Sequence, residues 1–296
     1  MKKLFLVIAA FNILAGCYTV RKELPDTKAV SQTAQRTWQT KKENLKAKHP
    51  HQEFPESLGG LLQSDEWTIY KDKEQEEFTG HVFYDNGVYT FKAGYALSDR
   101  KNKTITARGN VFVKQQQTPD ISYEAYADQG KYNYQTGKGK FQSVSKNPVK
   151  LIWTEPAQTV TATARQADFN TTTRVFTLTG NVFVTRTTPE GTQTMQADKI
   201  TLRQDEEYVH LDGHAVLSDG LRTLQASNVV YNGTQDEAHA NGDRPLVTGS
   251  TEQGTFAVIA DEVSSDAQGN VVQLNGRVQG WFVSPELNQH KLNSQF

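Results

Sequence analysis

Alternating hydrophobic and polar positions recur along the chain from about Trp67 onward, and they predict a series of short β-strands. The clearest example is Phe176-Thr-Leu-Thr-Gly-Asn-Val-Phe-Val184, and a close copy is Ile105-Thr-Ala-Arg-Gly-Asn-Val-Phe-Val113. Weaker copies lie at residues 78–84, 209–217 and 274–278. Period-two alternation rich in β-branched and aromatic residues is the signal of a strand. Glycine inside such a run predicts a kink, because glycine adopts backbone angles that other residues resist.

A second motif, Ala-Asp, alternates with this glycine-centred strand. It stands at Ala127, Ala167, Ala197 and Ala260, with Ala226-Ser227 as a variant. Sixteen residues separate Ala197 from Gly213, and the same spacing to a glycine follows Ala226 and Ala260. Turn sequences such as Asp85-Asn86-Gly87 and Asn232-Gly233 lie between the strands. No α-helical run stands among them, so parallel βαβ units are excluded and a solenoid, barrel, sandwich or jellyroll remains.

The first sixteen residues have the pattern of a secretory signal. Lys2 and Lys3 precede an apolar stretch, Leu4 to Ala15, that is too short to remain as a membrane-spanning helix. The stretch ends in Leu14-Ala15-Gly16-Cys17, which resembles the lipobox of bacterial lipoproteins. The resemblance implies that Cys17, the only cysteine, is lipidated and begins the mature protein. An ordinary signal peptide followed by a chance cysteine is the alternative.

The sequence divides into a signal peptide at 1–16, a lipidated tether at 17–65, a strand region at 66–284 and a tail at 285–296. The tether carries loosely spaced apolar residues and then prolines, so it is expected to be partly helical or disordered, as a solvated spacer or a partner-binding helix. The strand region is long enough for two halves, which would meet near Pro156.

Composition and charge narrow the classes of function. Hydrophobic residues make up 36% of the chain, which suits strands with one wet face. Loss of Lys2 and Lys3 with the signal leaves 30 basic against 33 acidic residues, a net charge of −3. No basic stripe is present to neutralise phosphates, so nucleic acid is not an expected partner. Attachment to the membrane is expected from acyl chains on Cys17.

Several stretches resemble the OstA-like proteins of lipopolysaccharide transport, a family that includes LptA, LptC and the N-terminal domain of LptD. The resemblance extends from about Trp67 to Val283 and is carried by Leu178-Thr-Gly-Asn-Val-Phe-Val184-Thr, Met195-Gln-Ala-Asp-Lys-Ile-Thr-Leu202, Pro148-Val-Lys-Leu151 and Pro245-Leu-Val247. It implies an all-β fold, an elongated open β-jellyroll of two antiparallel sheets built from hairpin repeats. It further implies a hydrophobic interior that holds acyl chains, edge-to-edge stacking with other jellyroll proteins, and no enzymatic activity.

In an open jellyroll one face of each strand lines the interior, so every second residue should be apolar. The resemblance implies that Ile200, Leu202, Val229 and Tyr231 face a lipid groove, and the alternation adds residues from other strands. The complete predicted groove consists of Val111, Val113, Val149, Leu151, Trp153, Val182, Val184, Ile200, Leu202, Val229, Tyr231, Phe256 and Val258. The alternative is that these residues fill a closed sandwich core.

Catalytic and metal-binding patterns are weak. His210 and His214 have a spacing that serves a metal on a helix, but they fall across a kinked strand, so no metal or other cofactor is expected. Gly137-Lys-Gly139 lacks the strand-to-helix context of a nucleotide loop, and no serine stands in a Gly-x-Ser-x-Gly elbow. A pair of carboxylates acting on glycans stays open, because neighbours in space cannot be read from the sequence.

The sequence therefore predicts a non-enzymatic, lipid-anchored protein that faces the periplasm. It would bind lipopolysaccharide or a related glycolipid and take part in its transport or in outer-membrane assembly. Tyr18, rather than an aspartate, follows Cys17, which resembles outer-membrane sorting in enteric bacteria and implies the outer rather than the inner membrane. One alternative is a structural scaffold that docks partner proteins by edge-strand pairing. The other is a parallel β-helix acting on polysaccharide, which the hairpin turns disfavour because they reverse the chain.

Overall fold

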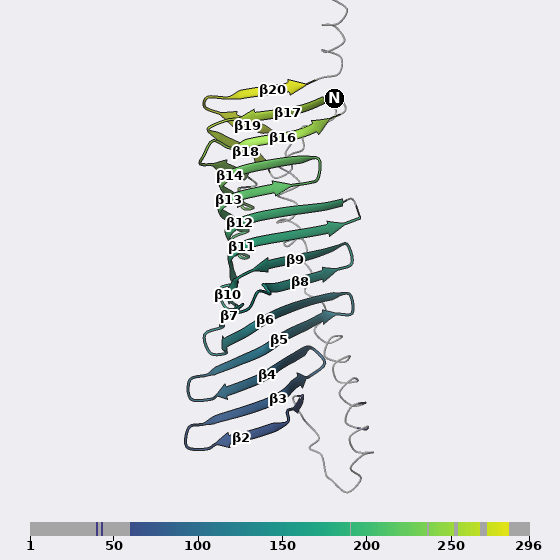
Figure 1. Ribbon diagram of the computed structural model, residues 1–296, viewed down its shortest axis with the longest axis vertical. Helices are drawn as coiled ribbons and strands as arrows, with labels where there is room; N and C mark the ends of the chain where they lie inside the picture. The colour runs from purple at the N-terminus through teal and green to yellow at the C-terminus, as the bar shows by residue number, and fades with distance from the viewer. Residues whose placement is uncertain are drawn as a thin grey trace, which may run out of the picture. The chain divides into compact units, whose positions relative to one another are not determined.

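The computed structural model describes residues 40, 43, 60–189, 191–235, 237–251, 254–266 and 271–283 (Figure 1). The signal peptide, Cys17, most of the tether at 17–65 and the tail at 285–296 lie outside the described residues. The described strands fall into two compact units that meet in sequence between Thr172 and Thr173. We call the strands before this point the N-terminal unit and those after it the C-terminal unit.

The N-terminal unit contains ten strands. They are β1 (Leu61–Gln63), β2 (Glu66–Tyr70), β3 (Gln75–Asp85), β4 (Tyr89–Asp99), β5 (Thr104–Thr118), β6 (Ile121–Asn133), β7 (Lys138–Gln142), β8 (Val149–Glu155), β9 (Gln158–Ala164) and β10 (Gln166–Asn170). Strand β1 lies inside the stretch expected to be tether and pairs with the end of β3, so strand structure begins at Leu61 and not at residue 66.

The C-terminal unit also contains ten strands. They are β11 (Val175–Thr188), β12 (Gly191–Arg203), β13 (Tyr208–Ser218), β14 (Arg222–Asn232), β15 (Glu237–Asn241), β16 (Leu246–Thr251), β17 (Gly254–Ile259), β18 (Glu262–Asp266), β19 (Val272–Asn275) and β20 (Gln279–Val283). In Figure 1 the strands of each unit follow one another as a ladder of hairpins.

The predicted division near Pro156 is wrong. Strands β8 and β9 pair along their whole length, from Val149 opposite Ala164 to Glu155 opposite Gln158. Pro156 lies in the turn that joins these two strands, so the chain reverses there within one unit. A proline that begins a tight turn and a proline in a linker look alike in sequence, because both only break a strand pattern.

Each long strand takes part in two layers. Residues 222–225 of β14 pair with β16, whereas its residues 228–232 pair with β15. Strand β6 is divided in the same way between β8 and β7. In each unit we call one sheet layer A: it includes β8 and β9 in the N-terminal unit, and β16, β17 and β20 in the C-terminal unit. Layer B includes β2, β7 and β10 in the first unit, and β15, β18 and β19 in the second.

The bend between the layers, which we call the corner, consists of two consecutive residues in the left-handed conformation. Gly180 and Asn181 have φ angles of 84° and 48°, and Gly213 and His214 have φ angles of 77° and 48°. The pairing register shifts at these points, for example between Thr179 and Val182. The kink predicted from the Gly-Asn-Val motif is thereby confirmed.

The Ala-Asp motif lies across the corner from the following glycine. A Cβ atom added to Gly213 would collide with the carboxylate of Asp198, and one added to Gly276 would lie 2.5 Å from Oδ2 of Asp261. The backbone N–H of Asp261 donates to the carbonyls of Asn275 and Gly276 at 2.9 and 3.0 Å. The sixteen-residue spacing is therefore the length of chain that runs from the corner along one layer-B strand, through the turn, and back along the next strand to the corner.

The described strand pairings within the two units are all antiparallel, which confirms the predicted all-β jellyroll of two antiparallel sheets in each unit. A parallel β-helix does not fit these pairings.

We expect Gly213→Ala to lower the free energy of unfolding by about 2–4 kcal/mol, because the new methyl group adds a clash with Asp198 to the strain of a positive φ. Gly220 is the matched control: its φ is also positive, at 87°, but an added Cβ would meet nothing within 4 Å. Gly220→Ala should cost only about 1 kcal/mol. Urea denaturation measures both values, and equal losses would show that the corner tolerates a side chain.

Candidate functional site

The inner face of layer A in the N-terminal unit carries three parallel rows of side chains, because paired residues on neighbouring antiparallel strands share a face. The row next to the corner is small, apolar and buried: Val82, Ala93, Val111, Ala127, Val149 and Ala164. The second row is larger and mostly half-buried: Phe91, Val113, Ala125, Leu151 and Ala162. The third row, farthest from the corner, reads Tyr89, Gln115, Tyr123, Trp153 and Val160.

Layer B faces this surface with apolar and aromatic side chains. Phe78, Ala96 and Ala107 form one buried cluster with Val82 and Val111 of layer A. Phe141 and Phe169 stack with their ring centroids 5.4 Å apart. Gly130 and Gly139 make room for these rings, since a Cβ on Gly139 would collide with Phe169. The two layers therefore pack directly against each other near the corner.

The C-terminal unit repeats this arrangement with a more deeply buried interior. One row of layer A runs through Val184, Met195, Leu217, Leu224, Val247 and Val258. One row of layer B runs through Leu178, Ile200, Leu211, Val229, Ala240, Val263 and Leu274. Val182, Val209 and Leu211 are completely buried, which is the behaviour of a packed core.

The thirteen residues predicted to line a groove all lie on these inner faces, but they divide into two groups. Seven are buried: Val111, Val149, Val182, Val184, Ile200, Val229 and Tyr231. Six are half-buried: Val113, Leu151, Trp153, Leu202, Phe256 and Val258. The buried residues hold the two layers together, and the half-buried ones leave apolar surface that a ligand can reach. Their role in lipid binding stays a prediction.

Sequence reasoning missed several inner residues, among them Phe91, Tyr89, Gln115, Tyr123 and Met195. Alternation within single strands was visible, but the register between strands was not. Only the register places Gln115 between two tyrosines, since Tyr89 and Tyr123 lie directly opposite it on either side.

The acidic residues of the Ala-Asp motif have structural partners. Asp128 accepts hydrogen bonds from the backbone N–H groups of Val144 and Ser145, both at 2.7 Å. A hydrogen bond from the Ser145 side chain, together with these two backbone bonds, lowers the pKa of Asp128. The guanidinium of Arg277 lies 2.8 Å from Asp261 and lowers the pKa of that carboxyl group. These carboxylates are committed to fixing loops and corners.

The two histidines considered for a metal site have different surroundings. His214 stands at a corner with Nδ1 2.8 Å from Oδ2 of Asp198, and this hydrogen bond and the carboxylate charge raise the pKa of His214. The ring of His210 lies edge-on to Tyr208. No group of three histidine, cysteine, aspartate or glutamate side chains capable of holding a metal occurs in the part of the chain that the structure describes. Within that same part, no helix has the length and apolar character needed to cross a bilayer.

Comparison with known proteins gives one family match and one similar solved structure. Residues 117–240, which run from β5 to β15, match the family described as lipopolysaccharide-assembly, LptC-related. Over this segment the chain is similar to the LptC-related family. The match confirms the predicted family resemblance, and it agrees with the expectation that the protein is not an enzyme.

One solved structure with a similar arrangement is the crystal structure of LptH, the LptA-homologous periplasmic component of the lipopolysaccharide transport device of Pseudomonas aeruginosa. The similarity covers 38% of this chain and 75% of LptH, at 15% sequence identity and a TM-score of 0.32. A likeness at this level is too weak to support an argument. A search of curated proteins found no sequence that matches the chain.

The Asp198–His214 pair should make stability depend on pH. Because the pKa of folded His214 is raised above 6.5, the pair stabilises the fold fully below about pH 6.5 and loses this effect as pH rises through the folded pKa. An NMR titration should give a midpoint above 6.5 for His214, and Asp198→Asn should lower that midpoint. Identical midpoints in the two proteins would contradict the assignment.

Proposed function

We propose that this protein is a lipid-anchored carrier that binds lipopolysaccharide or a related glycolipid inside its jellyroll units and takes part in its transport or in outer-membrane assembly. The observation that carries the proposal is the set of half-buried apolar residues beyond the buried corner rows, on strands that overlap the LptC-related segment. Burial of about 200 Å² of one acyl chain is worth about 5 kcal/mol before ordering costs.

The interior rows suit a ligand that must be released again. Val113, Leu151 and Leu202 offer only dispersion and hydrophobic contact, without a charged group that would fix one position. Contacts of this kind gain free energy in proportion to the area covered, so a chain can slide along them without breaking any single strong interaction. A carrier needs its ligand to slide and to leave, whereas an enzyme must hold its substrate in one fixed pose.

Strand edges are the proposed docking surfaces for other jellyroll proteins. Among the described residues, β20 pairs only with β17, and β2 pairs only with β3. Trp281, Phe282 and Val283 of β20 are each at least half exposed, as are Trp67 and Ile69 of β2. A strand with one unpaired edge and exposed apolar side chains favours addition of a partner strand.

The anchor in this proposal is Cys17, and Tyr18 after it favours the outer membrane.

A structural scaffold is the second candidate function. The completely buried Val182, Val209 and Leu211 favour it, because an interior of this kind in the C-terminal unit serves packing more than binding. In that case only the strand edges would have partners.

We expect a photo-crosslinking side chain at Leu151 or Leu202 to capture lipopolysaccharide in cells, because both positions face inward and are half-buried. Phe183 is the control, since it is 44% exposed and points outward between two buried valines. Mass spectrometry of the adducts identifies the lipid. Equal capture at Phe183 and Leu202, or none at either inward position, would contradict a lipid-binding interior.

A crosslinking side chain at Trp281 should capture a second jellyroll protein, because β20 presents a free edge. The control position is Tyr126, which is exposed on the flat outer face of layer A and not at an edge. Capture at Trp281 without lipid capture at Leu151 and Leu202 would support the scaffold. If Tyr126 captures the same partner with equal yield, docking by the edge strand is wrong.

A further inference from the structure

The outer face of layer A in the N-terminal unit carries a row of aromatic rings and lysines. These side chains alternate along their strands with the inward residues, so they point away from the interior. Each lies directly opposite the next one on the neighbouring antiparallel strand, from β3 through β4, β5 and β6 to β8. We call this set the outer row, and it consists of Phe83, Lys92, Phe112, Tyr126 and Lys150.

The first four side chains of the outer row contact one another. The ammonium group of Lys92 lies over two rings, 5.9 Å from the centroid of Phe83 and 5.7 Å from that of Phe112. The rings of Phe112 and Tyr126 follow, with centroids 5.0 Å apart and planes inclined by 48°. Four strand spacings of about 4.8 Å give the row a length of about 19 Å. Because these side chains already hold one another, little ordering is needed when a ligand binds.

The outer row carries positive charge that the protein does not neutralise by ion pairing. Lys92 and Lys150 are exposed, and in the described part of the chain neither has a carboxylate within salt-bridge distance. Lys114, in the next row of the same face, differs because it lies 3.2 Å from Glu124. An anionic ligand therefore finds two cationic partners, which are three strand spacings or about 14 Å apart.

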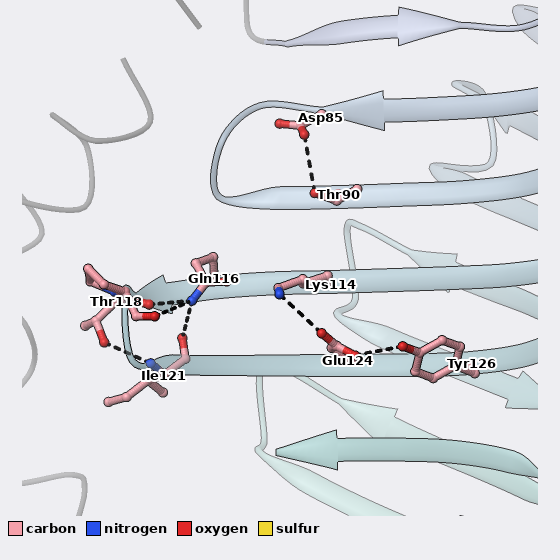
Figure 2. A network of polar contacts seen from close by, with 9 residues as sticks. Asp85, Thr90, Lys114, Gln116, Thr118, Ile121, Glu124 and Tyr126 are labelled. Carbon is pink, nitrogen blue, oxygen red and sulfur yellow. Dashed lines mark hydrogen bonds and ion pairs between the residues drawn. The ribbon is translucent and has the colours of Figure 1, made fainter. Parts of the chain in front are cut away.

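The next row of the same face places hydrogen-bonding groups beside the rings (Figure 2). Glu124 accepts a hydrogen bond from the Tyr126 hydroxyl at 2.8 Å and pairs with Lys114. The Thr90 hydroxyl donates to Oδ2 of Asp85 at 3.5 Å. A carboxylate accepts about four hydrogen bonds, more than these contacts use. The outer face therefore combines rings, ammonium groups and acceptors for hydroxyl groups.

From these observations we infer that the outer row binds a linear glycan strand that carries carboxylate groups, of the kind that forms peptidoglycan. The negative faces of aromatic rings attract the C–H groups of sugar rings, the lysines pair with carboxylates, and the neighbouring acidic side chains accept bonds from sugar hydroxyls. A row that crosses five strands suits several sugars of an extended polymer. The site uses the opposite face of the sheet from the interior, so it adds a second binding function to the proposed one.

A lipid surface fits the outer row less well than a glycan does. Phe83 and Phe112 are half-buried, so their rings do not project as an apolar anchor would. The carboxylates of Asp85 and Glu124 on the same face would also repel anionic headgroups. Sugar hydroxyls bond to such carboxylates instead of being repelled by them.

The test measures co-sedimentation of the full chain with insoluble peptidoglycan, and with chitin as an uncharged glycan. Tyr126→Ser removes a ring and should weaken binding to both glycans roughly threefold to tenfold. Tyr126→Phe keeps the ring and should change binding less than about twofold. Lys92→Gln combined with Lys150→Gln should weaken binding to peptidoglycan roughly threefold to tenfold and change binding to chitin less than about twofold.

Lys131→Gln combined with Lys140→Gln is the matched control. These lysines also lie opposite each other on neighbouring strands, but on the outer face of layer B, where Thr106 and Asp168 flank them in place of aromatic rings. The control removes the same charge and should change peptidoglycan binding less than about twofold. Equal losses in the two double variants would show that general charge attraction, and not the outer row, is responsible.

Circular dichroism checks that each variant is folded. If the wild-type chain does not bind peptidoglycan, the glycan site is overturned and the lipid-binding interior stays in place. Binding to phosphatidylglycerol vesicles that the Lys92 and Lys150 variant loses, without binding to peptidoglycan, assigns the row to a membrane surface and overturns the inference. Loss of the Trp281 crosslink in that variant, with peptidoglycan binding unchanged, assigns it to a protein partner. Peptidoglycan binding without lipid capture at Leu151 and Leu202 supports the glycan site and contradicts only the proposed function.

Discussion

The corner is the constraint on which the rest of the structure depends. A strand can belong to two sheets only if it turns sharply without losing its hydrogen bonds, and two consecutive left-handed residues achieve this turn. At Gly213 and Gly242 the first of the two positions needs glycine, because Asp198 and Ser227 from the neighbouring strands occupy the space of its Cβ. The long strands β6 and β14 therefore deliver one half to each layer, and the corner joins the two layers.

The graded interior follows from this geometry. Side chains next to the corner meet the opposite layer at once, so Val111, Val149 and Val182 are small and buried. Farther along the same strands, residues such as Leu151 and Trp153 have less protein opposite them and remain half-buried. Distance from the corner thus decides whether an inward residue contributes to stability or offers surface for binding. The two units differ in degree, since the C-terminal unit holds the completely buried Val209 and Leu211.

Much of the fold could be predicted from the sequence because two motifs mark each corner. The glycine motif forms the bend, and the Ala-Asp motif lies opposite it on the neighbouring strand. The inward direction of residues such as Val184 and Leu202 was also predictable, since alternation needs no knowledge of neighbouring strands. The sequence could not place Gln115 beside Tyr89 and Tyr123, because that depends on register across three strands. It also hid the three-residue strand β1 and the true division between the units, which falls in an ordinary turn, residues 171–174, like those within each unit.

The two layers differ in how constant the number of residues per hairpin is. Through layer B, fifteen positions separate Asp65 from Gly80, and the same number separates Asp198 from Gly213 and Asp261 from Gly276. Through layer A, thirteen positions separate His81 from Gly94, but eighteen separate Asn110 from Asp128. These layer-B hairpins thus have a constant number of residues, whereas the layer-A hairpins differ in length from one to the next. Residues added in pairs at the tips of the layer-A hairpins would keep every side chain on its face, so evolution or design can lengthen layer A while layer B stays unchanged.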